Sequence, residues 1–210
     1  MRKFTLIELL VVTSIIGTLS SLILPALAQG RSKVKQAVCI NNIRQVGLAC
    51  LSYTNENNSY GPRDDTLVEK KKWFKRIMPD YLPKGQTKGA HEVNKCPAGL
   101  TAKHKKHTNI GINVRISGKN ESDRFVRQRS TQSASPETVF LMDSFNRARF
   151  TSPWVVTNRK LIESGPQKRI ARHPKNTANI FFIDGSTSSR TYQFLITKST
   201  YGEVFWNPEK

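Results

Sequence analysis

The chain has 210 residues, with 34 Lys and Arg against 15 Asp and Glu, and its net charge is +19. About 150 residues follow the N-terminal region, which is enough for one globular domain and excludes two of ordinary size. The basic excess is concentrated in residues 59–130, which hold 17 Lys or Arg against seven Asp or Glu. A surface of this sign attracts polyanions, but it carries no information about the fold.

An almost unbroken apolar run from Phe4 to Leu27 begins the chain. About 20 apolar residues suffice to cross the hydrocarbon core as a helix, so the run predicts a single membrane span. It contains one carboxylate, Glu8, which costs about 2–3 kcal/mol or more at mid-membrane and therefore needs a partner. A cleaved signal peptide ending near Ala28 is the alternative, although its apolar core would be uncharged and about 7–15 residues long.

The pattern beyond Gly30 is amphipathic. Apolar side chains recur at spacings of four, three, four and three, at Cys39, Ile43, Val46, Cys50 and Tyr53. This stripe predicts a helix that packs one face against the rest of the protein. A continuous helix from Phe4 to Tyr53 would be about 75 Å long, and the turn signal at residues 55–62 would end it. Pro25 marks either a local break of this helix in an assembly or the end of the span.

Three short runs later in the chain predict strands. They are Ile110–Ile116, Thr138–Met142 and Ala178–Ile183, and the last leads through Asp184-Gly185 into a second arm at Ser186–Tyr192. This last pair predicts a β-hairpin with a positive φ at its tip. An antiparallel sheet laid on the amphipathic helix would bury the apolar faces of both, so the predicted fold class is α+β. The chain is expected to divide into four segments. They are a short N-terminal stretch at residues 1–3, an apolar helix at residues 4–28, an amphipathic helix at residues 29–58 and a loop-rich antiparallel β domain at residues 59–210.

Four motifs together resemble a known family. Phe4-Thr5-Leu6-Ile7-Glu8-Leu9-Leu10-Val11-Val12 resembles the N-terminal signature of type IV prepilins and type II secretion pseudopilins. The segments Cys39–Ala49, Cys96-Pro97, and Arg172-His173 followed by Asn179–Gly185 are similar to a pseudopilin-like subgroup with a late His to Asp-Gly motif. The resemblance covers both ends of the chain and patches between them. It implies a pilin-like fold, in which the long N-terminal helix packs on a C-terminal antiparallel β-sheet domain.

The resemblance also implies how the chain is processed and assembled. A prepilin peptidase would cut between Lys3 and Phe4 and methylate the new amine, although the family usually has Gly where this chain has Lys3. Glu8 would then pair with the Phe4 amine of a neighbouring subunit and set the axial register, because any other register leaves the charge unpaired. Residues 1–3 would be the leader and residues 4–28 the transmembrane and filament-core helix.

The function implied is that of a structural subunit of a type II secretion or type IV pilus-like filament. Its partners would be copies of itself or other pilin-like subunits, prepilin peptidase and the inner membrane. The N-terminus would lie in the cytoplasm, and residues 59–210 would lie in the periplasm or in the extracellular filament. The resemblance implies neither an enzyme nor a cofactor, and nothing in the sequence indicates sequence-specific binding of nucleic acid.

A polyanion-binding module held by an uncleaved anchor is the alternative function. Its ligand would be an acidic polysaccharide or DNA, bound outside the cytoplasm by basic residues interleaved with aromatic ones. A solvated loop surface with no specific role explains the same residues. The candidates are Lys70, Lys71, Lys72, Lys75, Arg76, Lys103, Lys105 and Lys106.

His173 and Asp184 raise the question of a catalytic or metal site. Neither has the close His or Cys companions that a metal site needs, so we predict no metal ligand and no catalytic residue. Asp184-Gly185 is expected to form the hairpin turn, and His173 to stabilise the sheet by hydrogen bonding. Ten residues separate His173 from Asp184, against the nine usual in the family, so we expect a one-residue bulge before the strand. Asp64-Asp65 and Asp143 are the only plausible carboxylate ligands for a calcium site, and they are weak candidates.

The three cysteines invite a disulfide if the domain is exported. Cys39 and Cys50 lie about three turns apart on one helix face, too far to bond each other. Cys96 could reach either of them, and three reduced thiols are the other outcome. The resemblance favours a Cys39–Cys96 pair, because both residues fall in its motifs.

Overall fold

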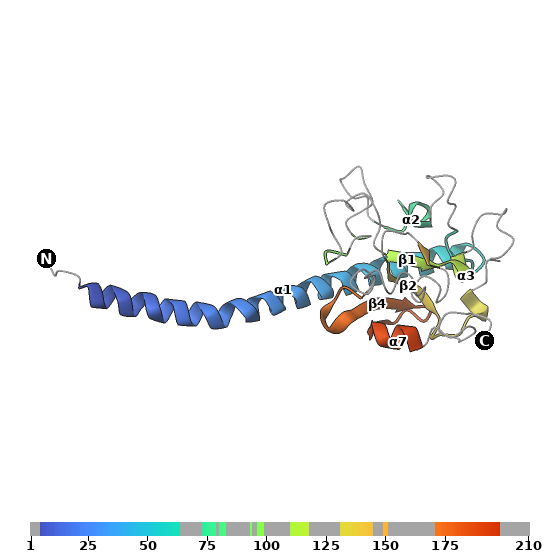
Figure 1. The fold of residues 1–210 in the computed structure, drawn as a ribbon. Coiled ribbons are helices and arrows are strands. Elements are labelled where there is room, and N and C mark those ends of the chain that lie inside the picture. The colour runs from blue at the N-terminus through green and yellow to red at the C-terminus, as the bar shows by residue number, and fades with distance from the viewer. Residues whose placement is uncertain are drawn as a thin grey trace.

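The computed structural model describes residues 5–63, 73–78, 80–82, 93, 96–98, 110–117, 131–144, 149–150 and 171–197. A long N-terminal helix projects from a small domain of helices and strands (Figure 1). Its second half belongs to that domain, whereas its first half extends away from it. The α+β fold class predicted from the sequence is therefore confirmed.

Helix α1 runs from Leu6 to Glu56 and contains 51 residues. It begins at a Thr5 N-cap, where the Thr5 side chain accepts a hydrogen bond from the Glu8 backbone N–H. It continues through Pro25 and ends three residues beyond the predicted Tyr53, where the Ser59 N–H bonds the Thr54 carbonyl oxygen. The apolar periodicity thus predicted the long helix and placed its end within one turn.

The first half of α1 lies uncovered. Every described residue from 5 to 35 is exposed. By length and composition this helix could cross a membrane. The exposed large apolar side chains of this half are Leu6, Ile7, Leu9, Leu10, Val11, Val12, Ile15, Ile16, Leu19, Leu22, Ile23, Leu24, Leu27 and Val34.

The domain is built on a five-stranded sheet with the order β3-β1-β2-β4-β5. The strands are β1 (Ile110–Asn113), β2 (Val139–Asp143), β3 (Arg149–Phe150), β4 (Thr177–Phe182) and β5 (Thr187–Thr191). Four strands pair antiparallel, and the two-residue β3 pairs parallel with β1. The short helices are α2 (Trp73–Arg76), α3 (Val114–Ser117) and α7 (Tyr192–Thr197), with the 3-10 turns η4 (Thr131–Ser133) and η5 (Pro174–Asn176).

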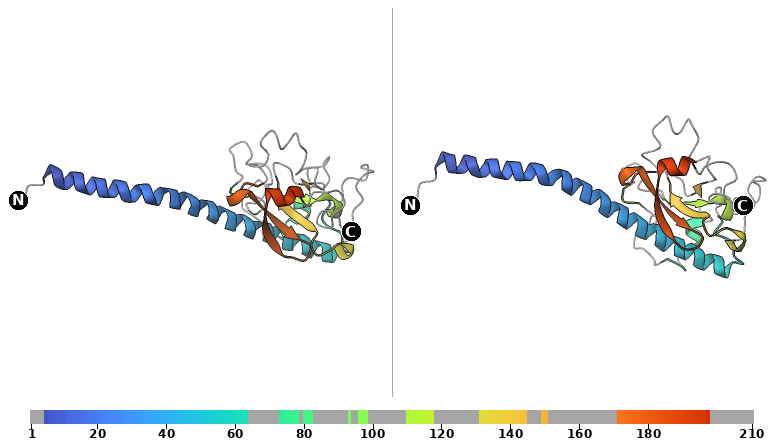
Figure 2. Two further views of the ribbon diagram at one scale, coloured as in Figure 1. Left: turned by 60° about the horizontal axis from the view of Figure 1, so that its bottom comes forward. Right: turned by 90° about the horizontal axis from the view of Figure 1, so that it is seen from below.

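Apolar side chains cover both faces of the sheet. The second half of α1 packs its buried stripe on one face, where Ile43 and Val46 meet Leu141 and Phe181. The other face carries a second apolar cluster that includes Ile180 and the α7 residues Tyr192 and Leu195. Figure 2 shows α1 and the red helix α7 on opposite sides of the strands. The predicted packing of the amphipathic helix on the sheet is therefore confirmed.

One glycine sets how closely α1 approaches the sheet. A Cβ atom at Gly47 would lie 2.5 Å from three ring carbons of Phe181, well inside van der Waals contact. The missing side chain therefore lets the fully buried Phe181 ring rest directly on the helix backbone. A polar contact adds to this packing, since the Gln36 side-chain amide lies 3.2 Å from the Thr177 and Ser189 hydroxyl oxygens.

Candidate functional site: a buried cluster of two cysteines, a histidine and an aspartate

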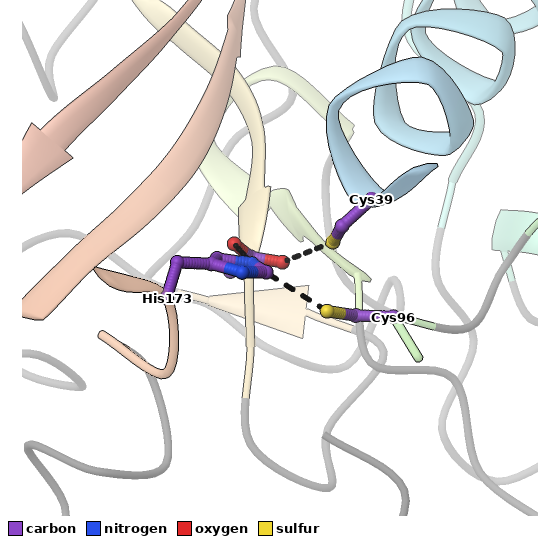
Figure 3. Close-up of side chains that lie close together, drawn as sticks. Cys39, Cys96 and His173 are labelled. Atoms are coloured by element: carbon purple, nitrogen blue, oxygen red, sulfur yellow. Dashed lines mark hydrogen bonds and ion pairs between the residues drawn. The ribbon is translucent and has the colours of Figure 1, made fainter. Parts of the chain in front are cut away.

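Four potential metal ligands converge at one buried point, where α1 meets the sheet. Their ligand atoms all lie within 4.8 Å of one another, and all four residues are buried. Figure 3 shows the two cysteine sulfur atoms directed at the histidine ring and the carboxylate beside it. We call this set the buried cluster: Cys39, Cys96, Asp143 and His173.

Direct contacts connect the four side chains of the buried cluster in series. The Cys39 thiol lies 3.2 Å from Oδ1 of Asp143, and His173 Nε2 lies 3.0 Å from Oδ2 of the same carboxylate. The Cys96 sulfur lies 3.5 Å from the same Nε2 atom. The backbone N–H of Asn179 donates to Oδ2 at 2.7 Å and so holds the carboxylate in place. Nδ1 of His173 is buried and has no hydrogen-bond partner among the residues that the structure describes.

Local structure explains how β2 and β4 place two of these side chains. Met142 pairs with Ile180 in the antiparallel ladder, so the last residue of β2, Asp143, comes to lie beside the first half of β4. His173 forms an isolated antiparallel bridge with Thr177, the first residue of β4. The turn η5 between them folds His173 back against the strand, with Lys175 and Asn176 at positive φ. This tight turn stands where the sequence predicted a one-residue bulge.

The other two ligands come from outside the sheet. Cys39 is the first fully buried residue of the α1 stripe, and Cys96 lies in a separate loop segment with none of its surface exposed. The segments that carry Cys39 and Asp143 are 104 residues apart in sequence, and those that carry Cys96 and His173 are 77 apart. The cluster therefore joins four segments that only the tertiary fold brings together.

The electrostatics of the cluster favour a charged Asp143–His173 pair. Burial raises the pKa of the Asp143 carboxyl, but the hydrogen bond to His173 and the nearby Arg172 charge hold the net pKa below its ordinary value. Burial lowers the pKa of His173, and its hydrogen bonds to Asp143 and Cys96 outweigh this and raise the pKa to about 9. The lowered pKa favours the ionised form of the carboxylate although it is fully buried.

The two cysteine thiols shift in opposite directions. Hydrogen bonding to Cys96, together with burial and the Asp143 charge, raises the pKa of Cys39. Hydrogen bonding to Cys39 lowers the pKa of Cys96 to about 6, helped by the hydrogen bond to His173 and opposed by burial. A thiolate at Cys96 is the form that binds metal ions. The site thus offers two sulfur donors, one imidazole nitrogen and one carboxylate oxygen.

The expectation that His173 has no close cysteine companion is wrong, because Cys96 lies within contact distance. Its carboxylate neighbour is Asp143, for which the sequence predicted only a weak tendency to bind calcium. Asp184 lies at the far end of β4, seven residues beyond Thr177 and so about 20 Å away at about 3.3 Å per residue. His173 and Asp184 therefore do not form one site.

Asp184 and Gly185 form the turn between β4 and β5. The Gly185 φ is 86°, and its N–H donates to the Phe182 carbonyl oxygen at 3.1 Å. The Asp184 carboxylate accepts a hydrogen bond from the Ser186 N–H at 2.8 Å. Both features match the turn that the sequence predicted at this position.

All three cysteines of the chain are buried thiols in the structure. Cys39 and Cys96, the pair favoured for a disulfide, are both in the buried cluster but are not bonded to each other. Cys50 lies in the apolar core beside Ile43 and Val46, outside the cluster. Burial raises the pKa of the Cys50 thiol.

Of the residues predicted to serve in leader cleavage, methylation and assembly, the structure describes only Glu8. Lys3 and Phe4 lie outside the described residues. Glu8 is exposed and closes a capping box: its Oε2 accepts hydrogen bonds from the Thr5 N–H and hydroxyl, both at 2.8 Å. Sequence reasoning missed this role, although Thr followed three residues later by Glu before an apolar run is its known signal.

Two of the eight basic candidates lie within the described residues. Lys75 is exposed on α2, and Arg76 is half-buried with its Nε donating to the Arg63 carbonyl oxygen at 2.9 Å. The neighbouring aromatic residues Trp73 and Phe74 are only 0% and 8% exposed, so they belong to the core and are not available to stack on a ligand. The other six candidates, Lys70, Lys71, Lys72, Lys103, Lys105 and Lys106, lie outside the described residues.

Comparisons of the chain with protein-family models, with curated proteins and with solved structures found no match. A long apolar N-terminal helix followed by a small, mainly antiparallel sheet is compatible with a pilin-like layout.

Proposed function

We propose that this protein is a pilin-like structural subunit, held in a membrane by the first half of α1 and assembled through that half into a type II secretion or type IV pilus-like filament. The observation that carries the proposal is the uncovered apolar half of α1, where every described residue from 5 to 35 is exposed. A surface of this length and composition needs lipid or neighbouring helices to cover it. The same segment bears the sequence that resembles the prepilin signature.

Covering the helix does not by itself position it. Lipid tails are as apolar as the side chains of a neighbouring subunit, so apolar burial alone gives no preferred register between helices. A polar group in the apolar segment can supply that register, because a misaligned neighbour leaves it unsatisfied. Glu8 is the only ionisable residue between Phe4 and Gly30, so it is the group we assign to this role.

The geometry at Glu8 leaves room for a partner from another subunit. Both Thr5 hydrogen bonds go to Oε2, and Oε1 has no hydrogen bond within the described part of the chain. A carboxylate has about four acceptor sites, so it can keep its Thr5 contacts and accept an amine as well. The proposed donor is the Phe4 amine of the adjacent subunit, freed by prepilin peptidase. The proposed topology places the N-terminus in the cytoplasm and the sheet domain outside the inner membrane.

Mass spectrometry of the native N-terminus tests this proposal. Protein purified from its native membranes should begin at Phe4 and carry an N-methyl group. An intact Met1 or a start near Gln29 would contradict the proposal, because neither places an amine near Glu8. An intact N-terminus combined with salt-sensitive retention on heparin would support the polyanion-binding alternative instead.

A further inference from the structure

We propose that the buried cluster is a structural zinc site that fastens α1 to the ends of the inner strands β2 and β4. Such a site would stabilise the domain independently of the filament function proposed above. The chemistry of the four donors, the distances between them and their burial all point to it.

The donor set matches zinc. Protein zinc sites are almost always tetrahedral and use Cys sulfur, His nitrogen and Asp or Glu oxygen. Two cysteine sulfur donors argue against Ca²⁺ and Mg²⁺, which prefer oxygen ligands. Two sulfur atoms with one nitrogen and one oxygen form a mixed tetrahedral set of the kind that zinc accepts.

The distances also match. Bonds of about 2.3 Å to sulfur and about 2.0–2.2 Å to nitrogen or oxygen place tetrahedral neighbours about 3.3–3.8 Å apart, with the two sulfur atoms at the upper end. Cys96 Sγ and His173 Nε2 lie 3.5 Å apart, and Cys39 Sγ and Asp143 Oδ1 lie 3.2 Å apart. The third contact, His173 Nε2 to Asp143 Oδ2, is 3.0 Å. All four donor atoms lie within 4.8 Å of one another, so shifts of about 1 Å or less would bring every pair to a tetrahedral spacing around an ion.

The site is closed, which indicates a structural role. The protein supplies all four ligands and all are buried, whereas catalytic zinc sites keep one position open for water or substrate. The Asn179 N–H orients the Asp143 carboxylate, as supporting hydrogen bonds do for carboxylate ligands of metals. The ligands come from α1, the Cys96 loop, the end of β2 and the turn before β4, so one ion would join four segments.

A disulfide explains less of this geometry. A Cys39–Cys96 bond would use the two sulfur atoms alone, and it would not explain why the Asp143–His173 pair lies in direct contact with both of them. A buried carboxylate is costly unless it is paired or coordinates a metal. Zinc accounts for all four side chains at once, and its removal should weaken contacts on all four segments together.

Metal analysis of the full chain tests the proposal directly. Purified in detergent without a polyhistidine tag and kept reduced, the wild-type protein should contain about one Zn²⁺ per chain. After chelation it should take up Co²⁺ and show the intense visible absorption of tetrahedral cobalt, with thiolate charge-transfer bands in the near ultraviolet. Absence of zinc with no uptake of either ion by the reduced protein would overturn the proposal. A Cys39–Cys96 disulfide in protein from native cells would also overturn it.

Three variants test the ligand assignment. Cys39→Ala and Asp143→Asn should lose the zinc, while Cys50→Ala should retain it, because Cys50 is an equally buried thiol on the same helix but lies outside the cluster. Retention of zinc by Asp143→Asn with an unchanged cobalt spectrum would contradict the assignment of the carboxylate. The cobalt spectrum of the wild-type chain keeps the test decisive if a variant fails to fold.

Discussion

His173 Nε2 lies 3.0 Å from Oδ2 of Asp143, and both side chains are removed from solvent at the junction of α1 and the sheet. Breaking a buried charged pair by removing one partner costs about 3–5 kcal/mol, because the remaining charge is left uncompensated. Replacing both partners with apolar residues removes that penalty. Substitution of one partner should therefore cost more stability than the pair of substitutions would suggest.

His173→Leu and Asp143→Leu should each lower the free energy of unfolding by about 3–5 kcal/mol. The double variant should lose clearly less than the sum of the two, since neither charge is then left alone. Urea unfolding of the metal-free full chain in detergent, followed by tryptophan fluorescence, measures all three. Strictly additive losses would show that the two side chains do not interact.

Chelation of zinc should lower the melting temperature of the wild-type domain. An ion present at about 100 times its dissociation constant contributes about 2.7 kcal/mol, which corresponds to about 5–10 °C for a chain of this size. Thermal melting by circular dichroism, before and after chelation, measures the shift. Added Zn²⁺ should restore the melting temperature and added Mg²⁺ should not, and equal melting curves in all three states would contradict a structural role.

Gly47→Ala should destabilise the domain although it favours the helix. Ala gains about 1 kcal/mol in helix propensity over Gly, but its Cβ would press on the face of the buried Phe181 ring at 2.5 Å. Overpacking of this kind costs about 1–3 kcal/mol, and the ring has no exposed side into which it can move. Chemical unfolding should therefore show a net loss.

Gly30→Ala is the matched control for this substitution. It makes the same change in the same helix, but nothing lies within 4 Å of its Cβ position. It should leave the unfolding of the domain unchanged or slightly favour the folded state. If both variants behaved alike, the close approach of α1 to Phe181 would not limit the packing.

The elements that the sequence predicted well are those whose signal is local. The stripe from Cys39 to Cys50 repeats every three to four residues, so it indicates both the helix and its buried face. The hairpin at Asp184-Gly185 is likewise encoded by adjacent residues, and Gly185 adopts the positive φ expected of it. Residues that are close in the sequence are therefore enough to predict these features.

The features that the sequence did not predict depend on tertiary contacts. The strand expected over Ile110–Ile116 ends at Asn113, and helix α3 follows it. The buried side-chain amide of Asn113 donates a hydrogen bond to the Val139 carbonyl oxygen. The two-residue strand β3 is too short to have a pattern. The buried cluster joins residues up to 104 positions apart in contacting pairs, beyond the reach of any spacing rule for metal ligands.

Glu8→Gln should abolish assembly while leaving membrane insertion intact. The substitution keeps the shape of the side chain and its ability to accept hydrogen bonds from Thr5, but it removes the charge that would pair with the Phe4 amine. Burial of the unpaired amine in an apolar bundle then opposes assembly. Membrane fractionation together with recovery of sheared filaments measures the two properties separately.

Thr5→Ala is the control that separates capping from assembly. It removes the Thr5 hydroxyl and so weakens the helix cap by about 0.5–2 kcal/mol, but it leaves the Glu8 carboxylate in place. Filaments should therefore still form from Thr5→Ala and be lost from Glu8→Gln. If Glu8→Gln assembled normally, Glu8 would serve only to cap α1, and the register between subunits would have to come from another polar group.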